Sequence, residues 1–104
     1  MNNKQKKLLK RTAQEEKPIF QLGKANLTEA FMTQVDEALT KREIVKLSIL
    51  QNATMADEAV EEALVDALNI QWSWHIGHTL TLYRPSQIEK NQSLSLEVKK
   101  QAMK

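Results

Sequence analysis

Gly23-Lys24-Ala25-Asn26 is the segment of this sequence best suited to contact a phosphate. An apolar run from Ile19 to Leu22 ends at the glycine, and a helix start follows at Leu27-Thr28-Glu29. A turn between a strand and a helix exposes backbone N–H groups, and such groups beside a lysine suit an anionic ligand. The same pattern also occurs in turns that bind nothing, so both interpretations remain open at this point.

A second candidate for phosphate contact is a basic segment near the N-terminus. Leu8, Leu9, Thr12 and Ala13 share one arc of a helix with 3.6 residues per turn, which predicts an amphipathic helix over residues 4–14. A run of lysines is often only a solvated helix face, but this run contains no acidic residue. The cations on the remaining arc are Lys4, Lys6, Lys7, Lys10 and Arg11, and Lys17 could extend the patch they form.

The acidic residues are segregated from this basic front. Residues 55–69 contain no lysine or arginine, and their acidic residues are Asp57, Glu58, Glu61, Glu62 and Asp66. Such a polarised chain can turn one face toward a polyanion and another face away from it. We interpret the acidic side chains as a solvated helix face, because neither a cleft nor a catalytic partner is evident in the sequence.

Other polar and aromatic residues give weaker signals. Arg84 beside Tyr83 could bind a phosphate or stack on a base, or could simply end a strand. Trp72 and Trp74 share one strand face and are expected to pack in or near the core. The two histidines, His75 and His78, lack a convincing third ligand, so we predict no metal site, no cofactor and no catalytic residue.

Length and composition limit the classes of protein to consider. A chain of 104 residues predicts one domain, and the absence of cysteine excludes disulfides and thiolate metal sites. We find no apolar run long enough to cross a membrane and no signal peptide. These features predict a cytoplasmic protein that does not associate with membranes.

The elements that position these residues follow from hydrophobic periodicity. Strands are expected at residues 17–22, 43–50, 72–76 and 79–83, the last two joined by a tight turn at Gly77-His78. Helices are expected at residues 4–14, at 28–42 after a cap at Asn26 or Thr28, and after a cap at Thr54. The order α-β-α-β-α-β-β predicts an α/β fold in which three helices pack on a four-stranded mixed sheet.

The last part of the sequence is polar and sparse in apolar residues. Pro85 ends the predicted fold, so we expect one domain at residues 1–85 and a mobile tail at residues 86–104. A short helix near residues 94–103 is possible within that tail.

Five segments together resemble the bacterial YhbY proteins, the stand-alone form of the CRM domain (chloroplast RNA splicing and ribosome maturation). The resemblance runs from about Lys4 to Arg84, in order and with compatible spacing. The segments that carry it are Lys4–Lys10, Lys17–Lys24, Leu27-Thr28, Ser48–Asn52 and Ile76–Arg84.

The resemblance implies an RNA-binding domain with a fold similar to the C-terminal domain of bacterial translation initiation factor three. Because the sequence contains no catalytic motif, we expect a protein that is not an enzyme, and we expect it to be a monomer. The resemblance further implies binding to ribosomal RNA in a precursor of the large ribosomal subunit. The family carries a Gly-x-x-Gly loop that clamps the nucleic-acid backbone. Here Asn26 stands at the fourth loop position; it tolerates left-handed geometry, but its side chain could crowd a phosphate.

The residues that we therefore expect to contact RNA are Lys4, Lys6, Lys7, Lys10, Arg11, Lys17, Gly23, Lys24, Ala25, Asn26 and Arg84. The alternative is a protein-interaction module that docks on a ribosomal or other assembly through its acidic helix, with little direct RNA contact.

Overall fold

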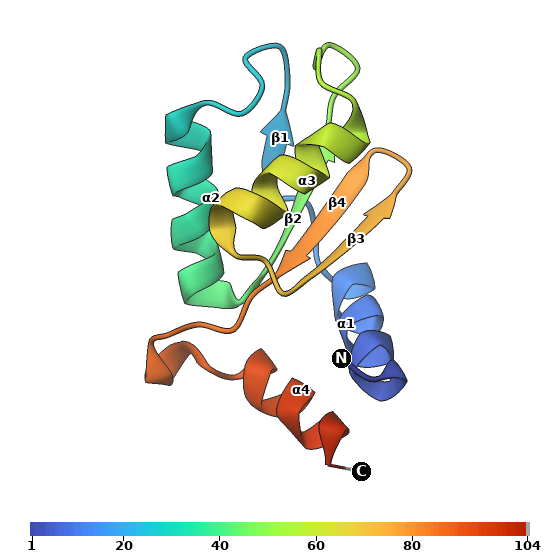
Figure 1. The fold of residues 1–104 in the computed structure, drawn as a ribbon, viewed down its shortest axis with the longest axis vertical. Coiled ribbons are helices and arrows are strands. Elements are labelled where there is room, and N and C mark those ends of the chain that lie inside the picture. The colour runs from blue at the N-terminus through green and yellow to red at the C-terminus, as the bar shows by residue number, and fades with distance from the viewer. Residues whose placement is uncertain (104) are drawn as a thin grey trace.

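The computed structural model describes residues 1–103 and confirms the predicted mixed α/β fold. In this range four strands form one sheet in the order β1-β2-β4-β3, in which β1 and β2 are parallel and the other neighbouring pairs are antiparallel (Figure 1). The elements in chain order are α1 (Asn3–Glu15), β1 (Phe20–Leu22), α2 (Glu29–Arg42), β2 (Ile44–Ile49), α3 (Asp57–Leu68), β3 (Trp72–Ile76), β4 (Thr79–Tyr83), a 3-10 turn (Glu89–Asn91) and α4 (Leu94–Ala102).

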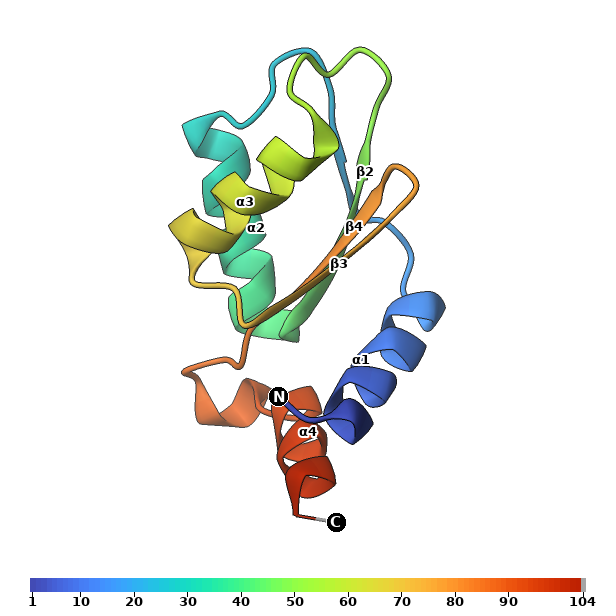
Figure 2. The same ribbon diagram turned by 45° about the vertical axis from the view of Figure 1, so that its right-hand side comes forward.

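The main core lies between the sheet and the pair α2 and α3, which cover one of its faces (Figure 2). Alternate residues of a strand point to the same face, so Val45 and Leu47 of β2 lie beside Leu80 and Leu82 of β4. The buried residues of this core are Leu22, Val35, Leu39, Val45, Leu47, Ile49, Val60, Leu64, Leu68, Leu80 and Leu82. The apolar periodicity of the sequence thus corresponds to real burial.

A second, smaller cluster lies on the other face of the sheet, beneath α1 and α4. Leu9 of α1, Tyr83 of β4 and Val98 of α4 are buried together there, and Trp72 packs against them. Burial, reinforced by the nearby Glu43 carboxylate, raises the pKa of the Tyr83 hydroxyl, which therefore stays neutral. This cluster attaches both ends of the chain to the last strand.

The segment after Ser86 differs from the mobile tail expected from the sequence, because α4 packs on α1. Leu94 and Val98 are four residues apart and therefore lie on one helix face, directed into the second cluster. Two apolar side chains in a polar segment give only a weak periodic signal in the sequence. They are nevertheless enough to hold the helix in place, because the second cluster offers an apolar surface on which they pack. The final position of the predicted tail, residue 104, lies outside the described residues.

Glu43 connects α4 to the body of the domain. Its carboxylate is fully buried and accepts hydrogen bonds from the backbone N–H of Ser86 at 2.7 Å and of Ser95 at 2.9 Å. Ser95 lies in the first turn of α4, where backbone N–H groups have no partner within the helix. Glu43 therefore caps α4 from a distant part of the chain, and its negative charge suits the helix N-terminus.

Two predicted helix starts have different outcomes. Thr28 caps α2, as expected, because its hydroxyl accepts a hydrogen bond from the Phe31 N–H at 3.1 Å. The prediction that Thr54 caps the next helix is wrong, since α3 begins after Ala56 with no side-chain cap. None of the helices in the described range is long and apolar enough to cross a membrane.

Candidate nucleic-acid interface

The loop Gly23–Asn26 follows β1 at one end of the sheet (Figure 1). The Asn26 N–H donates to the Gly23 carbonyl at 3.0 Å and closes a turn whose tip is formed by Lys24 and Ala25. Both tip residues are exposed, and their backbone N–H groups donate to no other described residue. Two N–H groups without a partner beside an ammonium group suit an anionic ligand.

Asn26 has the left-handed backbone geometry expected of it, with φ of 57°. Its side chain does not project toward a ligand, because it bonds to Thr54 in the loop that follows β2. The Asn26 side-chain nitrogen Nδ2 donates to the Thr54 hydroxyl at 2.5 Å, and the Thr54 backbone N–H donates to the Asn26 side-chain oxygen Oδ1 at 3.1 Å. The structure thus ties the two loops at this end of the sheet together.

Gly23 is also explained by the neighbouring loop. A Cβ atom built on Gly23 would lie 3.2 Å from the side-chain oxygen of Asn52, which is closer than most Cβ contacts. The glycine therefore makes room for the Asn52 amide beside it. Sequence reasoning placed neither Asn52 nor Thr54 in the site, because their contact with the first loop depends on the parallel pairing of β1 and β2.

We expect Asn26→Gly to lower the free energy of unfolding by about 1–2 kcal/mol, because two hydrogen bonds between the loops are lost. Glycine accepts the left-handed φ, so backbone strain does not add to this cost. RNA affinity should fall or stay constant, since the Asn26 side chain does not occupy the space of a phosphate. Urea unfolding and fluorescence anisotropy with labelled RNA measure the two quantities.

Thr54→Val is the control for this change, because it removes the hydroxyl but keeps the backbone N–H that donates to Asn26. Its effect on stability should be about half as large. Tighter RNA binding by a folded Asn26→Gly protein would contradict the assignment of Asn26 to loop attachment.

The basic residues of α1 lie on exposed positions, as predicted. Leu9 and Ala13 are buried beneath the helix, and a capping box between Asn2 and Gln5 fixes its N-terminus. The cations Lys4, Lys6, Lys7, Lys10 and Arg11 are all exposed, as is Lys17 in the connection to β1. The structure thus gathers these cations on one helix and the chain that leaves it.

The loop and the start of α1 do not form one compact site. They lie toward opposite ends of the longest dimension of the molecule, which measures 43 Å, and α1 stands on the sheet face away from α2 and α3 (Figures 1 and 2). The exposed half of that sheet face lies between them. A ligand that contacts both must therefore be extended, as a polynucleotide is.

Lys46 supports this arrangement from within the sheet. Its ammonium group donates to the carbonyl oxygens of Ala13 at 3.1 Å and Glu16 at 3.4 Å, at the C-terminus of α1. A cation at this end of a helix satisfies unpaired carbonyls and the helix dipole. Lys46 therefore positions the basic helix, and its charge is not directed to solvent.

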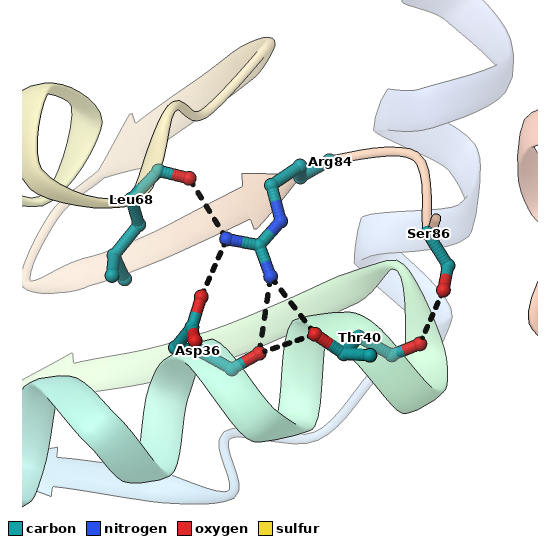
Figure 3. Close-up of polar contacts among 5 residues, drawn as sticks. All are labelled: Asp36, Thr40, Leu68, Arg84 and Ser86. Atoms are coloured by element: carbon teal, nitrogen blue, oxygen red, sulfur yellow. Dashed lines mark hydrogen bonds and ion pairs between the residues drawn. The ribbon is translucent and has the colours of Figure 1, made fainter. Parts of the chain in front are cut away.

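Arg84 was expected to contact RNA, but its guanidinium group is bonded within the protein (Figure 3). Its guanidinium donates to the Asp36 carboxylate at 2.7 Å, to the Leu68 carbonyl at 2.8 Å, and to the Asp36 carbonyl and Thr40 hydroxyl at longer distances. These bonds join the end of β4 to α2 and α3. Tyr83 beside it is fully buried and cannot stack on a base. We therefore assign Arg84 a structural role.

The histidines have a carboxylate partner that sequence reasoning missed. Asp57 at the start of α3 lies 3.0 Å from His78 Nδ1 and 3.2 Å from His75 Nε2. The hydrogen bond with His78 lowers the pKa of Asp57, followed by weaker effects of His75, while burial opposes the shift. Strand alternation could have revealed the contact, because His75 faces away from its neighbours Trp74 and Ile76 and toward α3.

This cluster does not by itself indicate catalysis. Among residues 1–103, no group of three or more histidine, cysteine, aspartate or glutamate side chains is arranged to hold a metal ion. The cluster fastens the β3–β4 hairpin to the acidic helix α3, which packs on the sheet face opposite α1 (Figure 2). Acidic and basic helices therefore lie on opposite sides of the sheet.

Comparison with known proteins agrees with this architecture. Residues 1–84 match the model of the CRS1 / YhbY (CRM) domain. The chain is 38% identical to the Bacillus subtilis "Probable RNA-binding protein YqeI", over 90% of this chain and 98% of that protein. It is 32% identical to a Haemophilus influenzae protein named as an RNA-binding protein, over 88% of this chain and 93% of that one.

A solved structure shares the fold as well as the sequence similarity. The solution structure of the Staphylococcus aureus protein SAV1595 superimposes with a TM-score of 0.67 at 32% sequence identity, and the match covers 89% of this chain and 97% of that one. Fold, motif order and sequence similarity therefore lead to one conclusion: this chain belongs to the CRS1/YhbY (CRM) domain family.

Proposed function

We propose that this protein binds RNA without catalysing a reaction on it, and that its ligand is ribosomal RNA during assembly of the large ribosomal subunit. The observation that carries the proposal is the exposed tip of the Gly23–Asn26 loop, where the backbone N–H groups of Lys24 and Ala25 donate to no other described residue and lie beside the Lys24 side chain. Hydrogen bonds to Thr54 hold this loop, so little conformational freedom is lost when a phosphate binds.

The charge distribution supports the same function. Exposed cations on α1 attract the phosphates of an RNA strand that passes the helix. This attraction supplies affinity that does not depend on the base sequence. The acidic helix α3 lies on the side of the sheet opposite α1, so the acidic and basic helices are separated (Figure 2). The names of the Bacillus and Haemophilus relatives indicate RNA binding in this family.

The ribosomal part of the proposal follows from the resemblance of the five sequence segments to YhbY proteins. We infer that the protein acts in the cytoplasm as a monomer on a precursor of the large subunit. Sedimentation of a cell extract through a sucrose gradient tests this. The protein should travel with precursors of the large subunit and leave that fraction after treatment with ribonuclease.

The salt dependence of RNA binding tests the role of the basic helix. Lys6→Gln with Lys7→Gln should weaken binding and reduce the slope of log affinity against log salt by about 1.4, since each lost contact to a single-stranded phosphate contributes about 0.7. The measurement is fluorescence anisotropy of a labelled RNA at several potassium chloride concentrations.

A matched control removes the same charge elsewhere. Lys41 at the end of α2 and Lys90 in the 3-10 turn are exposed and belong to elements other than α1. Lys41→Gln with Lys90→Gln should leave the slope unchanged. If both double variants behave like the parent, α1 is not part of the binding surface. A parent protein that binds no RNA even at low salt would favour the alternative, a protein-interaction module docking through α3.

A further inference from the structure

The sheet face beneath α1 is only partly covered, and its free part contains a cavity. Trp72, Tyr83 and Ile44 lie side by side at the end that α1 and α4 cover. The next two rows across the sheet remain open to a cavity of about 270 Å³. Its lining residues are Gln14, Lys46, Trp74, Ile76, Thr79 and Thr81.

Trp74 contributes the aromatic surface of this cavity. The sequence predicted a position in or near the core, and the side chain is partly buried, with α1 beside it. The Trp72 ring lies 6.1 Å from the Trp74 ring between centroids, and the Lys10 ammonium lies 5.7 Å from the Trp74 centroid. An aromatic ring beside a cation is a common arrangement for contact with single-stranded nucleic acid.

The polar groups around Trp74 differ in their availability. Lys46 is committed to the C-terminal carbonyls of α1. In contrast, the side chains of Gln14 and Thr79 are at least partly exposed and make no hydrogen bond to any other described residue, whereas Thr81 is buried. An amide and a hydroxyl both donate and accept, so they can pair with the edge of a planar polar ring.

The size and charge of the site restrict its occupant. Cavities that hold drug-sized molecules measure roughly 300–1,000 Å³, so this cavity suits one small ring system and not a large cofactor. The neighbouring Lys10, Lys6 and Lys7 side chains of α1 favour an occupant that carries negative charge outside the cavity. A nucleotide within a strand combines a planar base with an external phosphate.

We propose that this cavity binds one unpaired base of an RNA strand, stacked against Trp74, while the adjoining phosphates lie along α1. The inference rests on the proposed RNA-binding function and adds a base-contacting subsite to a surface that otherwise contacts only backbone. An unpaired base is required, because only an unstacked base offers its ring face and its edge together. The subsite also connects α1 with the Gly23–Asn26 loop across the sheet.

Two synthetic RNA strands separate base stacking from phosphate contact. Both contain about ten nucleotides, within the range that a single binding surface covers; one carries bases and the other is abasic throughout. Trp74→Leu should lose about fivefold to a hundredfold in affinity for the base-bearing strand, since stacking of one base contributes about that much. Its affinity for the abasic strand should stay that of the parent.

Fluorescence gives a second readout in a protein that keeps the proposed ring. Trp72→Phe leaves Trp74 as the single tryptophan of the chain. Its emission should be quenched by the base-bearing strand and not by the abasic strand. Trp74→Phe, which keeps an aromatic face, should retain most of the parent's affinity.

The outcomes distinguish the subsite from the general function. The subsite is refuted if Trp74→Leu binds the base-bearing strand like the parent, or loses equal affinity for both strands. It is also refuted if the base-bearing strand quenches the emission of Trp74 no more than the abasic strand does. If the parent binds neither strand at low salt, the proposed RNA-binding function itself fails.

Discussion

Gly23→Asp is expected to raise the dissociation constant for RNA by at least about a hundredfold, which corresponds to about 2.7 kcal/mol. The new carboxylate would lie beside the N–H groups of Lys24 and Ala25, where we propose that a phosphate binds. Like charges brought together with water excluded cost several kcal/mol. Anisotropy with a labelled RNA measures the change.

The fold should tolerate this substitution. The closest atoms to a side chain at Gly23 belong to the Asn52 amide, the far end of a flexible side chain that can turn away. Gly23 does not have the positive φ that favours glycine, in contrast to Gly77, so its backbone geometry accepts aspartate. Circular dichroism of Gly23→Asp should therefore match that of the parent.

Two further variants separate charge from size. Gly23→Ala adds the same Cβ without charge, and it should cost less than about tenfold in affinity. Lys24→Ala should cost on the order of 1 kcal/mol, because a single exposed charge is screened by salt. If a folded Gly23→Asp protein binds RNA as the parent does, the loop is a turn that does not contact RNA.

Glu43→Ala is expected to lower the free energy of unfolding by roughly 2–5 kcal/mol, a large part of the stability of a small domain. The change leaves the backbone N–H groups of Ser86 and Ser95 buried without an acceptor. Each such group costs about 1–3 kcal/mol. Urea unfolding followed by circular dichroism measures the loss, and limited proteolysis shows whether α4 has detached.

Glu43 also has a left-handed backbone, with φ of 67°, so the control must separate geometry from hydrogen bonding. Glu43→Gly relieves the geometry and removes the acceptors, and it should remain strongly destabilised. Glu97→Ala removes an exposed carboxylate from α4 itself and should change stability by less than about 0.5 kcal/mol. Parent-like stability of Glu43→Gly would show that Glu43 does not hold α4 through its carboxylate.

Local signals accounted for most of the fold. Apolar periodicity placed the helices and strands, and Gly77 marked the hairpin turn, because these features depend on residues close together in the sequence. The loop after β1 was recognised for the same reason. Strand β1 begins at Phe20, later than the predicted Lys17. Just before it, the Ile19 N–H donates a hydrogen bond to the Lys46 backbone carbonyl in β2.

Interactions between distant residues account for what the sequence did not reveal. Arg84 and Asp36 are 48 positions apart, and nothing near Arg84 shows that its charge is already satisfied. Asn26 and Thr54 are 28 positions apart, so the sequence suggested a helix cap where the structure has a bond between loops. The acceptor for Ser95 at Glu43 is likewise invisible to any local pattern.

β4 is the last strand in the sequence, yet it lies inside the sheet between β2 and β3. During synthesis, one edge of β2 must therefore stay unpaired until the chain has been made as far as Tyr83. An exposed strand edge invites pairing with other chains. The β3–β4 hairpin, whose contacts are local, can form first and then dock on β2 as a unit. Because β4 is made after β1 and β2, the sheet can be completed only when the β3–β4 hairpin docks on β2.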